Sequence, residues 1–360
     1  MVAQGHSEDA QVLTALADFR DPETGRSVTQ QGQVRDLQFS GDKLSLTLAL
    51  TTHSAPIAND IQQECVALLR SKFPQCQEID VRLGVHERPP QKLGQIGLAA
   101  KSVIAVGSGK GGVGKSTIAA SLAYGLKKAG SVVGLMDADV YGPSIPHMVG
   151  VDAKPEAVER RIKPIDVDGL KVMSMGFFVP PGEAVVWRGP MLHGAITQFL
   201  RDTDWGELDY LVIDMPPGTG DIALTLSQLL PLTGAVVVCT PQDVALLDAV
   251  KAIAMFRKVN IPVLGMVENM SYFLCPDNGK RYDIFGSGGA KKRALELDIP
   301  FLGEVPINIQ IRINGDEGRL AGNFRDEQAA PFLEQICHRL VKNLADNTRA
   351  HPPVASLPVL

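Results

Sequence analysis

The chain is defined first by features that it lacks. None of the apolar runs in its 360 residues approaches the ~20 residues that a membrane-spanning helix needs. The first residues, MVAQGHSEDAQ, do not follow the basic-then-apolar plan of a secretory signal. The formal net charge is −5, which argues against a general nucleic-acid-binding protein. We therefore expect a cytoplasmic globular protein with neither a membrane nor a nucleic-acid partner.

Cysteine is also scarce. The five cysteines are scattered and odd in number, so they do not form the disulfide framework of a small secreted protein. No two of them are spaced as C-x-x-C. Cys65, Cys239 and Cys337 fall on apolar faces of predicted elements and are expected in the core. The apolar fraction of 45% and the charged fraction of 21% are ordinary for a globular protein and sufficient for a large core.

The pattern along the chain predicts two domains. In residues 8–87, the segments Lys43–Thr51 and Glu78–His86 alternate apolar and polar residues, which indicates half-buried strands. Apolar residues at helical spacing accompany these strands, so a small α+β domain is expected there. Residues 88–99 contain two prolines and are expected to be a linker. The proline-rich residues 346–360 are expected to form a disordered tail.

Residues 100–345 alternate strands with helices, and the last helix is predicted at 328–344. Several strands are continuous apolar runs, such as VVGLM, YLVID and AVVVC. Such runs are typical of a parallel sheet that helices cover on both faces. The expected fold class is therefore α/β with a mainly parallel sheet. The predicted strands are 102–107, 132–136, 210–214, 235–239, 262–267 and 301–305.

Residues 109–116, GKGGVGKS, fit the phosphate-binding pattern G-x-x-x-x-G-K-S/T. The loop lies between a predicted strand and a predicted helix at 117–128, the context in which this pattern marks a P-loop NTPase. Glycines let successive backbone N–H groups point at phosphate oxygens, and a helix N-terminus favours an anion. Lys115 is expected to reach the β- and γ-phosphates, and Ser116 to bind Mg²⁺. The expected nucleotide ligands are Gly109, Lys110, Gly111, Gly112, Val113, Gly114, Lys115, Ser116 and Thr117.

Three aspartates follow predicted strands of this domain. Ligands of an open parallel sheet lie at the carboxyl ends of its strands, so these carboxylates are expected beside the loop. Asp214 is expected to hold Mg²⁺, and Asp137 is a second candidate for the metal. Asp139 is expected to orient or polarise the attacking water. The alternative for each is a helix cap or a turn residue.

Six motifs together resemble those of the Mrp proteins, iron–sulfur cluster carrier ATPases of the MinD/ParA-like P-loop class. The front domain resembles the iron–sulfur-maturation-type domain that is often fused to Mrp proteins, through Asp21-Pro22-Glu23 and Leu50-Thr51-Thr52. The six motifs are GKGGVGKS (109–116), DADVYGPS (137–144), DMPPGTGD (214–221), TPQ (240–242), NMSYF (269–273) and IFGSGGA (284–290).

The resemblance implies an enzyme that binds ATP and hydrolyses it slowly. It also implies a face-to-face homodimer that transfers iron–sulfur clusters to apoprotein recipients. Lys110 would then reach across the dimer to the partner's phosphates, and the alternative is a solvated surface lysine. Asn269 would contact adenine, and the alternative is a plain turn residue.

The sequence departs from the family pattern at the cluster site. Mrp carriers usually bear C-x-x-C after the NMS segment, so that a dimer supplies four thiolates to a bridging 4Fe–4S cluster. Here Asn278 stands in place of the second cysteine, and a dimer offers only Cys275 from each subunit. This leaves three alternatives. The cluster is held by Cys275 of both subunits together with other ligands, such as Asp277 or a small thiol, or it is bound elsewhere in the protein, or the protein binds no cluster. In the last case the ATPase would act as a scaffold.

The front domain departs as well, because relatives often carry a reactive cysteine after the L-T-T segment where this chain has Ala55. A docking or regulatory role is therefore expected of that domain. A ParA/MinD-type positioning ATPase remains an alternative for the whole chain, but it would need a basic surface or a basic C-terminal helix. A reductase with a bridging cluster would need two well-placed cysteines per subunit. The expected function is therefore a Mg²⁺- and ATP-dependent homodimeric carrier of iron–sulfur clusters.

Overall fold

The computed structural model describes residues 2–40, 42–159, 161–178, 189–218 and 220–352. The chain divides into two compact units, each with its own sheet. The first unit comprises the described residues up to Arg88 together with those from Val341 onward, and the second is Pro89–Leu340.

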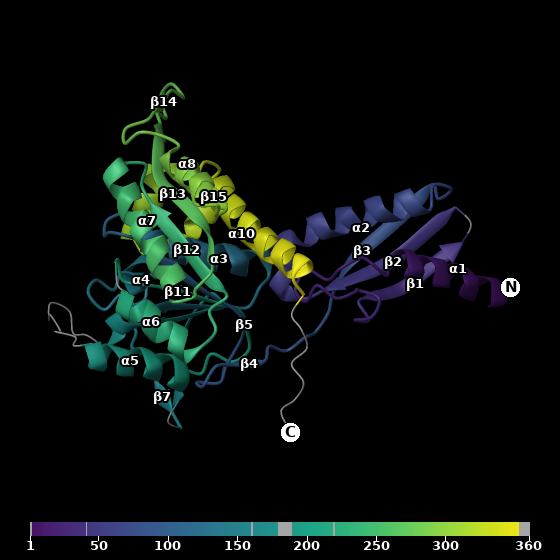
Figure 1. The fold of residues 1–360 in the computed structure, drawn as a ribbon, viewed down its shortest axis with the longest axis horizontal. Helices are drawn as coiled ribbons and strands as arrows, with labels where there is room; N and C mark the ends of the chain where they lie inside the picture. Colours follow the sequence, from purple (N-terminus) through teal and green to yellow (C-terminus); the bar gives the residue numbers. More distant parts are fainter. Residues whose placement is uncertain (1, 41, 160, 179–188, 219, 353–360) are drawn as a thin grey trace. The chain divides into compact units, whose positions relative to one another are not determined.

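The first unit contains a three-stranded sheet with helices packed against it (Figure 1). Strand β2 is central, with β1 antiparallel and β3 parallel to it. Alternate leucines of β2 and one face of α2 are buried, which confirms the predicted alternation; these residues are Leu44, Leu46, Leu48, Leu50, Ile61, Cys65 and Leu69. The elements are α1 (Val2–Ala15), β1 (Val34–Ser40), β2 (Lys43–Leu50), η1 (Thr52–Ile57), α2 (Ala58–Lys72) and β3 (Glu78–Val85).

The C-terminal helix α10 (Ala330–Ala350) is longer than the sequence predicted. The predicted disordered tail began at residue 346, and this is wrong for residues 346–350, which are helical. Within the first unit, Arg349 near the end of the helix pairs with Glu64 of α2 at 3.0 Å. A partner so distant in sequence leaves no trace in the local composition from which the tail was predicted. Residues 351–352 are not helical, and the rest of that predicted tail, 353–360, lies outside the described residues.

A buried polar cluster joins the loop between α1 and β1 to Arg88, at the end of the front segment of the first unit. Asp21 is fully buried, and its carboxylate accepts hydrogen bonds from the Thr24 backbone N–H (3.0 Å), the Gln33 amide (2.9 Å) and Arg88 (3.0 Å). Arg88 also pairs with Glu23 at 3.3 Å. Because a buried carboxylate is stable only when its oxygens are satisfied, these residues stabilise the fold as a group.

The second unit is built on a mainly parallel sheet in the order β14–β13–β12–β5–β11–β6–β10–β9, with β15 beside β13 and β4 beside β5. Each strand predicted for this region is present, and the predicted fold class is confirmed. The short strands β4, β9 and β14 pair antiparallel to their neighbours. The long strands are β5 (Leu98–Gly107), β6 (Val133–Asp137), β10 (Leu170–Ser174), β11 (Leu208–Asp214), β12 (Gly234–Cys239), β13 (Val263–Leu274) and β15 (Phe301–Ile307).

Residues 88–99, for which the sequence predicted a linker, contain β4 (Lys92–Leu93) and the first residues of β5. The sequence also did not predict a set of strands of two or three residues. Such short strands carry too few alternating positions for a pattern to be seen. They are β7 (Ala157–Val158), β8 (Arg161–Ile162), β9 (Ile165–Val167) and β14 (Arg281–Tyr282).

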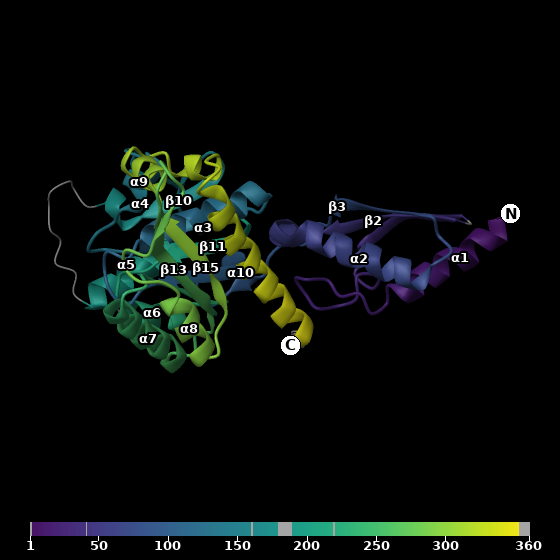
Figure 2. The same cartoon turned by 90° about the horizontal axis from the view of Figure 1, so that it is seen from above.

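Helices cover both faces of this sheet: Figure 2 shows α3, α4 and α9 on one face and α6, α7 and α8 on the other. Strands β6, β11 and β12 are buried along their whole length, which explains their continuous apolar runs. No helix in the described part of the chain is long and apolar enough to cross a membrane. The remaining elements are α3 (Lys115–Ala129), α4 (Ile145–Val149), η2 (Met175–Phe177), α5 (Gly189–Asp202), α6 (Gly220–Leu229), α7 (Asp243–Lys258), α8 (Gly289–Glu296), α9 (Ile309–Asp316) and η3 (Leu320–Phe324).

The carboxyl ends of three central strands meet at one edge of the sheet. Strand β11 lies between β5 and β6 and is parallel to both. The register places Asp214 at the end of β11 beside Asp137 at the end of β6. The glycine-rich loop that follows β5 therefore opens beside both aspartates.

We predict that Asp21→Ala destabilises the first unit by about 3–5 kcal/mol, because it leaves Arg88 and the other donors without their buried acceptor. Amide hydrogen exchange in β2 of the full-length protein measures this local stability. The control is Glu78→Ala, which removes the ion pair between Glu78 and Lys43. These side chains are 62% and 70% exposed, so the variant should leave the exchange unchanged. Equal exchange in the two variants would contradict the assigned role of the cluster.

Candidate active site

The glycine-rich loop leads directly from β5 into α3. Gly112 and Gly114 have φ angles of +79° and +78°, the left-handed region that glycine adopts without strain. Gly114 is the residue that precedes α3, and no side chain caps the helix there. The backbone N–H groups of the first turn are therefore available to a ligand, and the helix dipole favours an anion at this point.

The ammonium group of Lys115 lies among carboxylates. Its Nζ is 2.5 Å from Oδ1 of Asp214 and 3.6 Å from Oδ2 of Asp139, and it also donates to the Ser116 hydroxyl at 3.1 Å. The Lys115 side chain is 7% exposed and that of Asp214 is fully buried. The structure thus brings together four of the residues that the sequence predicted for this site.

The aspartate carboxylates differ in what they contact. Asp137 accepts hydrogen bonds from the backbone N–H groups of Asp139 (3.0 Å) and Ile145 (3.2 Å) and from the Ser174 hydroxyl (3.0 Å). Both of its oxygens are therefore engaged in holding the loop after β6. Burial and the neighbouring Asp214 raise the pKa of Asp137 to about 8, against the opposing effect of these hydrogen bonds.

Asp214 is suited to a metal ion. Burial raises its pKa, and the adjacent Lys115 opposes that rise by favouring the charged form. Its Oδ2 atom is buried and has no hydrogen-bond partner among the described residues. A buried carboxylate oxygen without a partner, close to the Ser116 hydroxyl, matches the hard oxygen donors that Mg²⁺ prefers. The described residues hold no group of three or more His, Cys, Asp or Glu side chains around one point, so phosphate and water would complete such a site.

Asp139 stands at the start of a tight loop. Its Oδ1 atom accepts the backbone N–H groups of Tyr141 and Gly142, each at 3.3 Å. The loop is therefore organised around this carboxylate. The other oxygen faces Lys115.

Two adjoining cavities flank the start of α3. The first, of about 270 Å³, is lined by the glycine-rich loop, Lys110, Asp139 and Pro217 and has the residues expected for phosphates. The second, of about 520 Å³, is predominantly apolar and adjoins α4, α9 and α10. We call them the phosphate cavity and the nucleoside cavity. Both are lined by Gly114, Thr117, Ser144 and Met148, so they lie next to each other at the start of α3.

Asn269 and Met270 of β13 line the nucleoside cavity, where the sequence placed an adenine contact for Asn269. The Asn269 side chain is buried and donates from Nδ2 to the Val113 carbonyl of the glycine-rich loop at 2.9 Å. Lys110 lines the phosphate cavity, and within the described residues its ammonium group has no ion-pair partner.

Cys275 lies at the turn between β13 and β14, directly after the strand whose Asn269 and Met270 line the nucleoside cavity, and it is half-buried. Its backbone N–H donates to the Lys280 carbonyl (3.0 Å), and its carbonyl accepts from Gly279 (2.8 Å). Asn278 closes the turn by accepting the Lys280 backbone N–H on Oδ1 at 2.9 Å. The residue that replaces a cysteine therefore has a structural role in the turn.

The other cysteines differ from Cys275. Cys65, Cys239 and Cys337 are buried, as predicted, and burial raises the pKa of each thiol to about 12. These three thiols therefore belong to the core, where no exposed surface brings an incoming cluster to them. Cys76 of the first unit is partly exposed.

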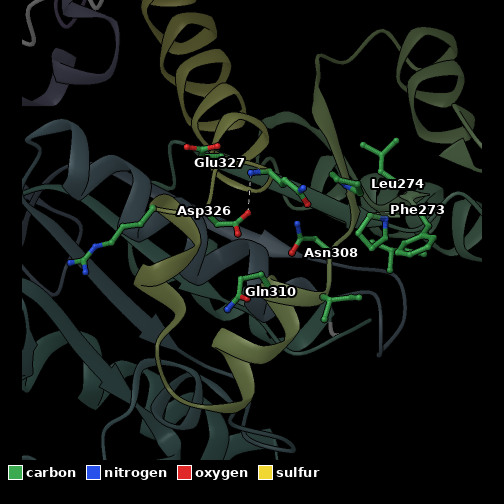
Figure 3. A pocket seen from close by; sticks show the side chains of 12 residues that line it. Phe273, Leu274, Asn308, Gln310, Asp326 and Glu327 are labelled. Atoms are coloured by element: carbon green, nitrogen blue, oxygen red, sulfur yellow. Dashed lines mark hydrogen bonds between the residues drawn. The ribbon is translucent and has the colours of Figure 1, made fainter. Parts of the chain in front are cut away.

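Sequence reasoning missed a third cavity, of about 490 Å³, beside the Cys275 turn. Figure 3 shows Phe273 and Leu274 on one side of it and Asp326 and Glu327 on the other. Residues 306–308 form part of its wall and also line the nucleoside cavity. Three segments far apart in the chain build this cavity, so no local pattern could indicate it.

Sequence reasoning also missed Glu268, which is fully buried at the end of the parallel part of β13. Its carboxylate accepts the backbone N–H groups of Gly288 (3.2 Å) and Ala290 (2.8 Å) at the start of α8, and the Ser271 hydroxyl (2.6 Å). A charged residue that follows the apolar run VLGMV was the available signal.

The parallel sheet, the glycine-rich loop and the buried lysine–carboxylate cluster define a P-loop NTPase. Within that class, the chain belongs to the family described as NUBPL iron-transfer P-loop NTPase, whose model matches residues 99–341. A second model, described as iron–sulfur cluster assembly protein, matches residues 9–83. The resemblance to iron–sulfur carriers that the motifs indicated is confirmed.

Known relatives agree with this assignment. An iron–sulfur cluster carrier protein of Deinococcus radiodurans is 45% identical over 352 residues, which are 97% of this chain and 99% of that protein. A solved nucleotide-binding protein of Archaeoglobus fulgidus in complex with ADP is 42% identical, with a TM-score of 0.57 over 64% of this chain and 90% of its own. The cell division ATPase MinD of Pyrococcus furiosus, 23% identical with a TM-score of 0.50 over 66% of this chain and 97% of its own, shares the fold.

We predict that Asp214→Asn weakens ATP binding by at least about tenfold in the presence of Mg²⁺ and far less in EDTA, because the amide keeps the side-chain volume but removes the charged metal ligand. Calorimetric titration under both conditions measures the difference. Asp221→Asn, an exposed acid of the same DMPPGTGD motif, is the matched control. An equal loss with and without the metal ion would show that Asp214 does not act through Mg²⁺.

Proposed function

We propose that the protein is an ATP-hydrolysing homodimer that binds iron–sulfur clusters and transfers them to apoproteins in the cytoplasm. The observation that carries the nucleotide part is the buried contact of Lys115 with Asp214 and Asp139 at the mouth of the phosphate cavity. The cargo follows from the family to which the chain belongs and from its carrier relative. A compartment that keeps thiols reduced suits five free cysteines.

The two adjoining cavities would accommodate ATP in one orientation. Its phosphates would lie in the phosphate cavity, where uncapped N–H groups and Lys115 provide positive charge. Its adenosine would lie in the apolar nucleoside cavity beside Asn269. Mg²⁺, held by Ser116 and Asp214, would neutralise phosphate charge as the leaving group departs.

Hydrolysis needs a positioned water molecule, and we assign this task to the Asp139 carboxylate. With phosphate present, the γ-phosphate becomes a further acceptor for Lys115, which relaxes the contact of the lysine with Asp139 at 3.6 Å. The Asp139 carboxylate is then available to orient the attacking water. Asp137 positions this carboxylate by holding the backbone of Asp139.

A homodimer accounts for the exposed apolar side chains around the loop. Tyr141 beside the phosphate cavity is 66% exposed, and Val244 and Leu247 at the start of α7 are 66% and 55% exposed. This part of α7 adjoins the loop, because a Cβ on Gly109 would lie 2.1 Å from the Asp248 carbonyl oxygen. Apolar groups gathered beside a site are commonly covered by a partner. In such a dimer, Lys110 would reach the phosphates of the partner subunit.

We predict that Lys115→Ala and Lys110→Ala each lower ATP hydrolysis at least about a hundredfold, since each removes a positive charge from the transition state. A mixture of the two variants should regain about a quarter of the wild-type rate. Half of the subunit pairs are then mixed, and each mixed pair contains one complete site if Lys110 acts across the dimer. Steady-state phosphate release measures the rates. A mixture as inactive as its components would show that Lys110 acts within its own subunit.

The Cys275 turn is the site proposed for the cluster. Apolar side chains around the turn are exposed, with Leu274 at 44% and Ile284 at 57%. Two subunits would supply two thiolates, and Asp277 or a small thiol would complete the coordination. The cluster is cargo, so a site with few protein ligands is compatible with release.

We predict that the anaerobically reconstituted wild-type protein binds iron and sulfide, that Cys275→Ala does not, and that Asn278→Cys retains the cluster longer in the presence of a chelator. The last change restores four thiolates per dimer and costs only the hydrogen bond to Lys280. Absorption spectra and iron counting measure uptake. Cys76→Ala, at the other cysteine outside the core, is the control. Failure of the wild type to take up any iron would overturn the carrier function.

A further inference from the structure

Asn269 contacts the phosphate loop itself. Its Nδ2 atom donates to the Val113 carbonyl at 2.9 Å, across 156 positions of sequence, and the side chain is 7% exposed. The contact is close, because a Cβ on Gly114 would lie 2.1 Å from the same nitrogen. A backbone carbonyl accepts only from a donor, so the amide nitrogen and not the amide oxygen faces the loop.

The peptide bond that this contact holds is one that would otherwise rotate easily. Val113 lies between Gly112 and Gly114, which both have left-handed φ angles. Glycine adopts many backbone conformations at little cost, so the Val113–Gly114 peptide plane has low intrinsic barriers to reorientation. In a trans peptide the C=O and N–H groups point in opposite directions. Fixing the Val113 oxygen therefore also fixes the direction of the Gly114 N–H group, which belongs to the lining of the phosphate cavity.

Asn269 is itself firmly placed by its neighbours in β13. The preceding residue, Glu268, is fully buried and bonded to the start of α8 through Ala290 at 2.8 Å. The following residue, Met270, has a φ angle of +54°, and the register of β13 with β15 shifts between Asn269 and Phe273. A left-handed methionine beside a strand irregularity persists only where the surroundings fix it. The backbone of Asn269 is therefore held on both sides.

From this geometry we propose that Asn269 is a positioning residue for the phosphate loop, which orients the Val113–Gly114 peptide for triphosphate binding. This rests on the proposed ATP-binding function and goes beyond a contact with the base. Without the side-chain donor, the Val113 carbonyl would be free to turn toward the phosphates, where its negative end repels them. The effect of Asn269 on binding should therefore be independent of the base.

The test compares two ligands, ATP and inorganic tripolyphosphate, which has phosphates and no base. The variant is Asn269→Leu, because leucine is similar in size and, unlike aspartate, adds no charge that would itself repel phosphate. Calorimetric titration in Mg²⁺ should show the dissociation constants of both ligands raised by a similar factor of about ten, as expected when one hydrogen bond is lost. Asn269→Ala is a second variant with the same expectation, in case leucine is not accommodated.

The matched control is Asn59→Leu. Asn59 is an exposed asparagine of α2 in the first unit and lines neither cavity, so binding of both ligands should be unchanged. Circular dichroism and the melting temperature verify folding of each variant, since a residue that only supports folding would not change the affinity of folded protein.

Each outcome is decisive. If both Asn269 variants weaken ATP but not tripolyphosphate, Asn269 acts on the base and the proposal is overturned. If neither ligand is affected, the contact with Val113 has no role in binding and the proposal is also overturned. If the wild-type protein binds neither ligand, the proposed ATP-binding function fails before the role of Asn269 is in question.

Discussion

The nucleotide site depends on one constraint, the burial of Lys115 among carboxylates. A buried ammonium group is stable only if it is paired, and Asp214 at 2.5 Å and Asp139 at 3.6 Å provide that pairing within the protein. Nucleotide binding therefore exchanges one set of anions for another, and its free energy is the difference between the two. The raised pKa of Asp137 also results from burial, because ionising two adjacent buried carboxylates, Asp137 and Asp214, has a high energetic cost.

Strand β13 connects this site to the rest of the second unit. Its residues reach, in order, the start of α8 through Glu268, the phosphate loop through Asn269 and the nucleoside cavity through Met270. The strand then lines the third cavity with Leu274 and ends at the Cys275 turn. Residues 306–308 also line both the nucleoside cavity and the third cavity. The residues proposed for nucleotide and for cargo thus belong to one continuous piece of sheet.

Much of this arrangement was visible in the sequence because it is local. The glycine-rich loop, the apolar strands and the aspartates at strand ends are short patterns with a direct physical cause. The sequence placed Asp214 beside the loop, but it did not predict the pairing with Lys115, 99 positions away. Nor did it predict the contact of Asn269 with Val113, 156 positions away. The sequence placed Asp137 as a second metal candidate, but only the fold shows that its oxygens are engaged by the loop and by Ser174. The helical end at Arg349 was missed for the same reason, because Glu64 stabilises it from far away.

Asn278 bears on how the proposed cluster site is built. In many small metal sites the ligand loop has no defined structure until the metal binds, so that metal affinity and folding are one event. Here the turn is closed by the protein itself, through the Asn278 side chain and the backbone pair of Cys275 and Lys280. A turn that is already folded does not lose its structure when cargo leaves. The replacement that removes a thiolate therefore also supplies an amide acceptor that stabilises the turn, and at the proposed cluster site loading and release become matters of coordination chemistry and not of folding.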